Sequence, residues 1–173
     1  MQCSTLTEQA RHWAKVQPET IWMRDLSQKG STDYTWGAAV AEIDRVAAWL
    51  EAEFAHGQHM ALLSRNRAHW IMADMGIIHS GNVTVPLFTT HAQATAEYIL
   101  DFTDTQVLFL GETENWEGVK AVLPESCLIV TLPGADCDLP HTKWEQLVAE
   151  APSDAPAYEP LADDTVSLVF TSG

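Results

Sequence analysis

The residues with the clearest chemical pattern stand at positions 171–173, where an apolar run opens into small residues. The run, residues 166–170, is rich in β-branched and aromatic side chains, which favour a buried strand. Thr171, Ser172 and Gly173 follow it. Hydroxyls beside backbone amides can bind anionic oxygens, and a glycine permits a close backbone approach. The pattern predicts a strand leading into the start of a phosphate-binding loop. An ordinary strand with a frayed end is the alternative.

Two further polar groups are candidates for chemistry, and a structural role is favoured for both. Arg65, Asn66 and Arg67 follow the apolar run 60–63, and open α/β sheets bind ligands outside the carboxyl ends of their strands. Helix capping and loop hydrogen bonds are the preferred explanation for these three residues. Asp74 stands in an otherwise apolar segment, where we expect a buried acid satisfied by a hydroxyl or a backbone donor.

The histidines and cysteines give no pattern typical of a metal centre or a disulfide. The seven histidines include no H-E-x-x-H motif, and His56 and His59 lie in an expected surface loop. Cys3, Cys127 and Cys137 are odd in number and lack C-x-x-C spacing, which predicts reduced thiols. We therefore assign no metal ligand and no catalytic residue.

The charge of the chain limits its partners. A formal net charge of −15 arises from 24 acidic and nine basic residues, and such a surface repels nucleic acid and anionic lipid. No apolar stretch approaches the length of a membrane span, and the first residues lack the layout of a signal peptide. We expect a cytoplasmic protein. If a nucleotide binds, Mg²⁺ or protein outside this chain must neutralise it.

The first third of the chain predicts two helices and a hairpin. Leu6, Ala10 and Trp13 mark one face of a short helix that ends before Pro18. The segments 20–26 and 33–35 flank a polar loop, as in a hairpin. Thr35 is placed to cap the next helix, in which apolar residues recur at steps of three and four up to position 54.

The remainder alternates apolar strands with helices. Strands are expected at 60–63, 83–87, 106–110 and 128–132, and helices at 68–80, at 90–102 with a Thr90/Gln93 capping box, at 115–122, and after a Thr142/Glu145 capping box. Continuous apolar strands that alternate with helices predict a mostly parallel sheet with helices on both faces, an α/β fold. We divide the chain into an α/β unit at 1–150, a Pro-rich connector at 151–164, and a last strand with the loop start at 165–173.

Several stretches together resemble the adenylate-forming enzymes, and within them the bacterial long-chain acyl-CoA synthetases. Tyr34-Thr35-Trp36 is similar to the family motif (Y/L)TW, and residues 63–74 are similar to S-x-N-R-P-E-W-x-x-A-D. Residues 81–87 are similar to G-A-V-x-V-P-(I/L), and residues 97–100 to the x-Y-I-L that follows it. Asp163-Asp164 and residues 170–173 match the first half of D-D-x-A-x-(I/L)-x-(Y/F)-T-S-G-T-T-G-x-P-K-G. Their order and spacing agree along the chain. Ala68 and His69 depart from the Pro-Glu of the subgroup.

The resemblance implies an ATP-dependent acid–thiol ligase. In that family a fatty carboxylate attacks the α-phosphate of Mg²⁺-bound ATP, and coenzyme A then takes the acyl group. Thr171, Ser172 and Gly173 correspond to the start of the loop that holds the triphosphate. The rest of that loop and the other nucleotide contacts lie downstream in the family. We therefore expect the N-terminal part of the large domain, which is inactive by itself, binds no cofactor tightly, and self-associates through uncovered apolar surface.

Two classes of alternative stay open. Another adenylate-forming ligase, acting on aryl acids, amino acids or acyl-carrier proteins, would share these stretches. A self-standing truncated module that pairs with a complete enzyme is the alternative outside enzymology. The substrate-selecting residues of the family do not fall within these 173 residues, so the sequence does not separate the ligases.

Overall fold

The computed structural model describes residues 5–27, 30–152, 154 and 156–171. Its helices are α1 (Leu6–Val16), α2 (Trp36–Glu53), α3 (Ala68–His79), α4 (Gln93–Thr103), α5 (Trp116–Lys120) and α6 (Trp144–Glu150). Its strands are β1 (Ile21–Ser27), β2 (Gly30–Thr35), β3 (His59–Leu63), β4 (Val83–Leu87), β5 (Val107–Leu110), β6 (Leu128–Thr131) and β7 (Thr142–Lys143). The predicted α/β fold is confirmed.

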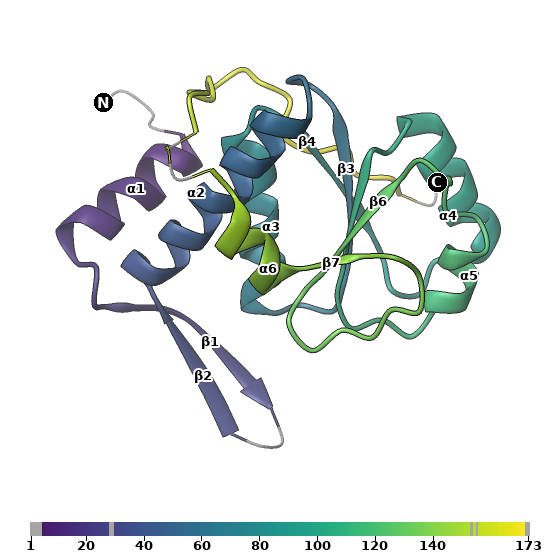
Figure 1. Cartoon of the computed structure of the whole chain (residues 1–173), viewed down its shortest axis with the longest axis horizontal. Helices are drawn as coiled ribbons and strands as arrows, with labels where there is room; N and C mark the ends of the chain where they lie inside the picture. Colours follow the sequence, from purple (N-terminus) through teal and green to yellow (C-terminus); the bar gives the residue numbers. More distant parts are fainter. Residues whose placement is uncertain (1–4, 28–29, 153, 155, 172–173) are drawn as a thin grey trace.

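The centre of the molecule is a five-stranded sheet in the order β4-β3-β5-β6-β7, and every pair in it is parallel. β1 and β2 form a separate antiparallel hairpin that projects from the end of the molecule below α2 (Figure 1). The chain runs from β3 outward to β4 and then crosses β3 to reach β5. The strand order therefore reverses at β3: the connection after β3 leads to β4 on one side of it, and the connection after β5 leads to β6 on the other side.

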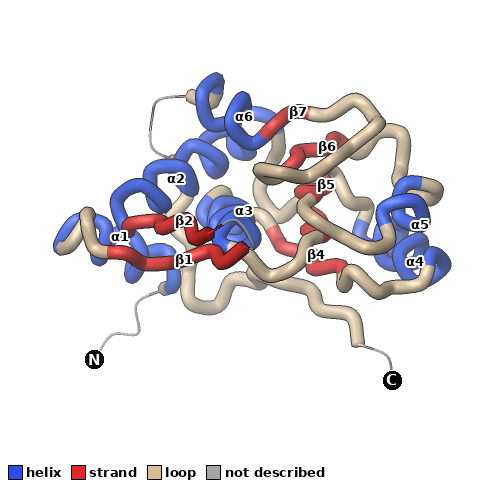
Figure 2. Tube along the Cα trace, turned by 90° about the horizontal axis from the view of Figure 1, so that it is seen from below, coloured by secondary structure: helices blue, strands red, loops and turns tan. Residues whose placement is uncertain are grey.

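Helices cover both faces of the sheet, as the sequence predicts. α1, α2, α3 and α6 lie on one side, and α4 and α5 lie on the other (Figures 1 and 2). Alternate residues of each strand supply the two cores: Leu62 and Phe109 pack in the α2–α3 core, whereas Leu63 and Leu108 pack in the α4–α5 core. This alternation explains why the strands are apolar throughout.

The N-terminal capping of the helices agrees with the sequence in one case and differs in two. Thr35 caps α2 by accepting the backbone N–H of Ala38 at 3.3 Å. The capping boxes predicted for α4 and α6 are wrong, because these helices begin after Ala92 and Lys143, and neither N-cap side chain makes a capping hydrogen bond. Thr142 instead pairs with Val130 of β6 in the short strand β7, and this extended pairing moves the N-cap of α6 from Thr142 to Lys143.

A capping box that the sequence analysis did not identify begins α1. The Thr5 hydroxyl accepts the Glu8 backbone N–H at 3.2 Å, and the Glu8 carboxylate accepts the Thr5 backbone N–H at 2.8 Å. The pair satisfies two N–H groups that the first turn cannot pair internally.

The Pro-rich segment 151–164 has no helix or strand among its described residues, but it is firmly attached to the α/β unit. The Glu51 carboxylate of α2 accepts the backbone N–H groups of Ala157 and Tyr158, both at 2.8 Å. The Tyr158 ring lies against Gly81, where an added Cβ would meet ring carbons at 2.9–3.0 Å. Gly81 also has a φ of +71°, so two independent constraints favour glycine there.

Arg45 of α2 holds the C-terminal end of α6. Its guanidinium donates to the carbonyl groups of Val148 at 2.9 Å, Ala149 at 3.1 Å and Pro152 at 2.9 Å. Carbonyl groups at a helix end lack internal partners, so one cation beside them satisfies several acceptors.

Candidate nucleotide-binding edge of the sheet

The predicted phosphate-binding residues lie at the end of a segment that runs beside β4. The backbone N–H of Thr84 donates to Val166 at 3.0 Å, and the Leu168 N–H donates to Thr84 at 2.9 Å, which makes one parallel bridge between Thr84 and Ser167. The strand predicted at 166–170 is thus reduced to a single bridge at the edge of the sheet.

This bridge places Thr171 at the carboxyl edge of the sheet. The segment is parallel to β4 at Ser167, and Thr171 lies four residues beyond that position and is exposed. An exposed hydroxyl at this edge has the position that a ligand-binding loop requires in an open α/β sheet. Ser172 and Gly173 lie outside the described residues, so their part in the loop stays a prediction.

The topology of the sheet makes this edge suitable for a ligand. β3 continues into α3 on one face, while its neighbour β5 continues into α5 on the opposite face. Connections that leave adjacent parallel strands in opposite directions open a crevice outside the strand ends. Thr171 lies at the same carboxyl edge, beside β4.

Close packing fixes the loops after β3 and β5. The Ser64 hydroxyl donates to the Arg65 carbonyl at 2.9 Å, and a Cβ at Gly111 would lie 2.1 Å from the Ser64 oxygen. The Arg65 backbone N–H donates to the Glu112 carbonyl at 2.8 Å. A glycine is therefore required where the two loops meet.

The three polar residues after β3 have different environments. Arg65 pairs with Glu112 at 3.2 Å and with Glu114, and Asn66 is exposed. Arg67 precedes α3 without capping it; its Nε atom is buried and has no hydrogen-bond acceptor. Helix capping or loop hydrogen bonding, the role preferred from the sequence, therefore accounts for Arg65 and does not account for Arg67.

The cap of α3 comes from the hairpin. Asp25 of β1 accepts the Ala68 backbone N–H at 2.7 Å, across a sequence separation of 43 residues. A capping acceptor so far away leaves no local signal, and sequence reasoning missed it.

The loop between β4 and α4 carries an aromatic pair. The Phe88 and His91 rings meet edge to face with their centroids 4.9 Å apart, and the Asn115 side chain donates to the His91 carbonyl. The His91 Nδ1 atom is buried without a partner, and burial lowers the pKa of this imidazole. Burial thus favours the neutral imidazole of His91, which can both accept and donate a hydrogen bond.

Asp74 was expected to be a buried acid satisfied by a nearby hydroxyl or backbone donor. Burial raises the pKa of its carboxyl group, and the neighbouring Thr84 hydroxyl offsets part of that shift. No ordinary hydrogen bond joins the two side chains, because the Thr84 Oγ1 atom is buried without a partner. Asp74 is half-buried rather than fully buried, and the expected hydrogen bond is not formed in good geometry.

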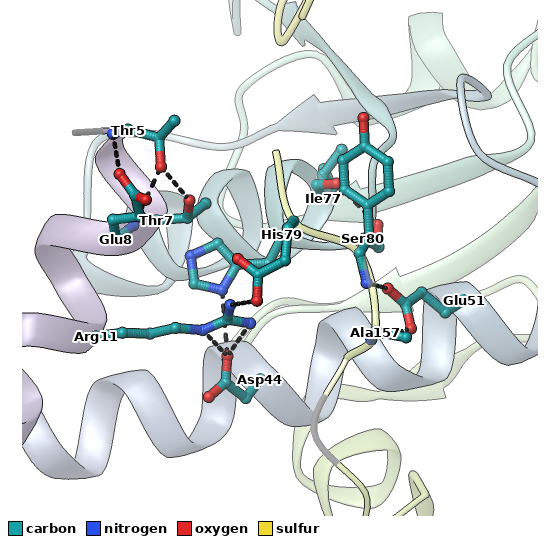
Figure 3. Close-up of polar contacts among 12 residues, drawn as sticks. Thr5, Thr7, Glu8, Arg11, Asp44, Glu51, Ile77, His79, Ser80 and Ala157 are labelled. Carbon is teal, nitrogen blue, oxygen red and sulfur yellow. Dashed lines mark hydrogen bonds and ion pairs between the residues drawn. The ribbon is translucent and has the colours of Figure 1, made fainter. Parts of the chain in front are cut away.

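A second polar cluster joins α1, α2 and α3 away from the sheet edge (Figure 3). Asp44 accepts Arg11 Nη2 at 3.2 Å and contacts His79 Nδ1 at 3.2 Å. Burial opposes ionisation of Asp44, but the hydrogen bond with His79 and the charge of Arg11 hold the pKa of this carboxyl below its usual value. Arg11 also faces Glu159 at 3.8 Å. These contacts tie helices and connector together and need no catalytic explanation.

His69 of α3 is buried between two aromatic rings. Tyr34 and Trp144 each meet the imidazole edge to face at 5.2 Å, and Trp144 Nε1 donates to Glu42 at 2.6 Å. Burial, and after it the charge of Arg67, lowers the pKa of His69 to about 4. His69, which stands where the long-chain subgroup has Glu, is therefore a neutral ring that packs between two aromatic side chains.

The structure gives no grounds for a metal centre or a disulfide in the part of the chain it describes. No group of three His, Cys, Asp or Glu side chains there could hold an ion. Cys127 and Cys137 are free, and burial raises the pKa of the Cys127 thiol to about 12; Cys3 lies outside the described residues. The His56 ring contacts the Tyr158 ring at an interplanar angle of 60°, with the ring centroids 4.7 Å apart. Among the helices described, none is long and apolar enough to cross a membrane.

The chain belongs to the AMP-binding enzyme family, whose profile matches residues 10–173. Among curated proteins it is 32% identical over 149 residues to a propanoyl:CoA ligase of Rhodococcus jostii (strain RHA1), whose acyl group carries a methyl-dioxo-octahydroindenyl ring system. A ligase of the same description from Mycobacterium tuberculosis is 30% identical over 158 residues. These matches cover 75% and 82% of this chain, and the chain spans 28% of the length of each relative.

Solved structures share the fold along nearly the whole chain. A protein described as a long-chain-fatty-acid CoA ligase from Rhodopseudomonas palustris superposes with a TM-score of 0.79 at 20% identity, covering 99% of this chain and 42% of that one. The N-terminal domain of FACL13 from Mycobacterium tuberculosis gives a TM-score of 0.76 at 22% identity, with coverage of 99% and 42%. The α/β unit described above is therefore the fold of the N-terminal part of such enzymes.

Proposed function

We propose that the protein acts as an ATP-dependent acid–CoA ligase for long-chain fatty acids, and that Thr171, Ser172 and Gly173 begin its triphosphate loop. The family match over residues 10–173 carries the ligase part of this proposal, and the resemblance of the sequence stretches to long-chain acyl-CoA synthetases supports the fatty-acid part. The position of Thr171 at the carboxyl edge of the sheet supports it.

The chemistry suits that edge. Phosphoryl oxygens gain charge during adenylation of a carboxylate, and hydroxyl and amide donors beside a strand end can meet that charge. Mg²⁺, when bound, supplies positive charge that this acidic chain lacks, since its net charge is −15. We propose that the 173 residues contribute donors and orientation and do not complete the reaction by themselves. A cytoplasmic location remains part of this proposal.

A second substrate class has its own support. The two curated relatives at 32% and 30% identity are CoA ligases for a ring-bearing propanoate, whereas the fatty-acid ligase structure is 20% identical. A bulky alicyclic acid is therefore the second candidate, ahead of aryl acids, amino acids and acyl-carrier-protein substrates.

The test is acyl-CoA formation by the polypeptide encoded by the complete reading frame, with ATP, Mg²⁺ and coenzyme A. Palmitate, an alicyclic propanoate and benzoate serve as competing acids. A kcat/KM that is highest for palmitate supports the fatty-acid assignment. A kcat/KM that is highest for the alicyclic propanoate contradicts the fatty-acid assignment and supports a bulky alicyclic acid as the substrate. Absence of ATP-dependent thioester formation with all acids contradicts the ligase proposal and favours an interaction module.

A further inference from the structure

A cavity lies between the β1–β2 hairpin and the start of α3, outside the carboxyl end of β3. Its volume is about 890 Å³. The residues that line it include Arg24, Arg65, Arg67, Trp70, Ile71 and Glu112. Three of the nine basic residues of a chain with a net charge of −15 thus face one cavity.

Two of these arginines are already neutralised. Arg24 donates from Nε and Nη2 to the two carboxylate oxygens of Asp33, and Arg65 is paired with Glu112 and Glu114. Asp25, which also lines the cavity, is engaged by the Ala68 backbone N–H at 2.7 Å. The acids that line the cavity therefore have partners other than Arg67.

Arg67 is the exception. Among the ion pairs of the described residues, none includes Arg67. Its Nε–H is buried without an acceptor, which is unfavourable for a charged donor; a ligand would reach the guanidinium through its terminal nitrogens. An oxyanion is the acceptor that a guanidinium binds best, through two parallel hydrogen bonds.

Apart from Asn66, the rest of the cavity lining is apolar. Trp70 is half-buried, while Ile71 and Leu26 are 39% and 80% exposed. Exposed aliphatic side chains beside an unpaired guanidinium suit a ligand that has a charged end and an apolar body.

We infer that this cavity, which we call the Arg67 cavity, binds an organic oxyanion that carries an apolar group. The inference does not depend on the proposed ligase activity, because it rests on Arg67 and the apolar residues beside it and makes no use of Thr171. Its polar contact is the Arg67 guanidinium, and its apolar contacts are Trp70, Ile71 and Leu26.

The experiment follows the arginine Nε–H resonances of the 173-residue chain by NMR during titration with three probes. Sodium octanoate tests the complete ligand chemistry, inorganic phosphate tests the oxyanion alone, and hexanol tests the apolar part alone. We expect a saturable shift of the Arg67 Nε–H with octanoate, and weaker binding of phosphate and hexanol. The Arg67→Gln variant should bind octanoate about tenfold more weakly or worse.

Arg24→Gln is the matched control, since Arg24 lines the same cavity but is paired with Asp33; it should leave octanoate affinity within about twofold. Unsaturable shifts, or equal octanoate affinity in wild type and Arg67→Gln, would overturn the site. Phosphate binding as tight as octanoate would overturn the apolar part of the inference. If Arg67→Gln does not fold, Arg67→Lys replaces it, with the same loss expected because a lysine cannot form the bidentate contact.

Discussion

The two faces of the parallel sheet are closed in different ways. On the α2–α3 face, Trp144 and Phe109 are fully buried and their rings meet at 6.5 Å. On the α4 face, Tyr98 and Phe102 are 60% and 66% exposed, and the Phe170 ring lies against them at 6.2 and 5.8 Å. Both faces have a buried core, but the α4 face also exposes aromatic side chains beside the segment that leads to Thr171. Substitutions of aromatic residues should therefore have different effects on the two faces.

A matched pair of phenylalanines measures this difference most strongly. Phe109→Ala removes a fully buried ring and should lower the free energy of unfolding by about 3–5 kcal/mol, because it loses transfer energy and leaves a cavity. Phe102→Ala removes a ring that is 66% exposed and should cost less than about 0.5 kcal/mol. Urea unfolding monitored by circular dichroism gives both values; similar losses would contradict the comparison.

The α2–α3 face should also respond to acid through His69. Its pKa is lowered from 6.5 to about 4, so the unfolded chain takes up the proton first as the pH falls. This contribution to stability is complete above pH ~6.5 and is lost progressively toward pH ~4, amounting to about 3 kcal/mol.

The variant that isolates this contribution is His69→Phe, which cannot titrate. Unfolding free energies measured at several pH values should fall more steeply for wild type than for the variant within that window. Parallel pH profiles would show that burial of His69 does not couple folding to protonation.

A smaller effect is expected where the connector meets α2. Glu51→Gln leaves one oxygen acceptor for the backbone N–H groups of Ala157 and Tyr158 and should cost about 1 kcal/mol. Amide hydrogen exchange at those two positions should accelerate. Glu53→Gln, an exposed change on the same helix, is the control, and equal exchange rates in both variants would exclude the Glu51 contact as an anchor.

Substitutions at the exposed aromatic surface of α4 should have the smallest effect on the free energy of unfolding. They should, however, change the self-association of the chain. If this surface drives self-association, Tyr98→Ser combined with Phe102→Ser should shift sedimentation toward the monomer while unfolding changes little. Trp13→Ser on α1, which removes a ring that is 36% exposed, is the comparison variant. A wild-type chain that remains monomeric at high concentration would contradict the predicted self-association.

The sequence predicts those parts of the fold that depend on local periodicity. Apolar spacing predicts α2 and the buried strands. Thr35 is predictable as a cap because its hydroxyl accepts a backbone N–H only three residues further along the chain. The Asp25 cap of α3 and the Glu51 anchor of the connector join residues 43 and about 106 positions apart, so no local pattern encodes them. The predicted Thr142/Glu145 capping box does not form because Thr142 pairs with β6 in the sheet instead of capping the helix.

The candidate site was predictable only in outline. Small hydroxyl residues after an apolar run indicate a loop at a strand end, and the structure puts Thr171 at that edge. The unpaired state of Arg67 depends on which acids lie near it in space. Only the arrangement of the hairpin, the start of α3 and the loop after β5 reveals that Arg24 and Arg65 have acidic partners, whereas the Arg67 side chain has none among the residues that the structure describes.

The central claim is that residues 171–173 begin the loop that holds the triphosphate. Its most direct test is fatty-acid-dependent ATP–pyrophosphate exchange by the polypeptide encoded by the complete reading frame, comparing wild type with Thr171→Val and Ser172→Ala. Loss of hydroxyl donors to a charged oxygen should reduce exchange by about tenfold or more in at least one variant, with circular dichroism unchanged. Wild-type exchange rates in both variants would contradict the account.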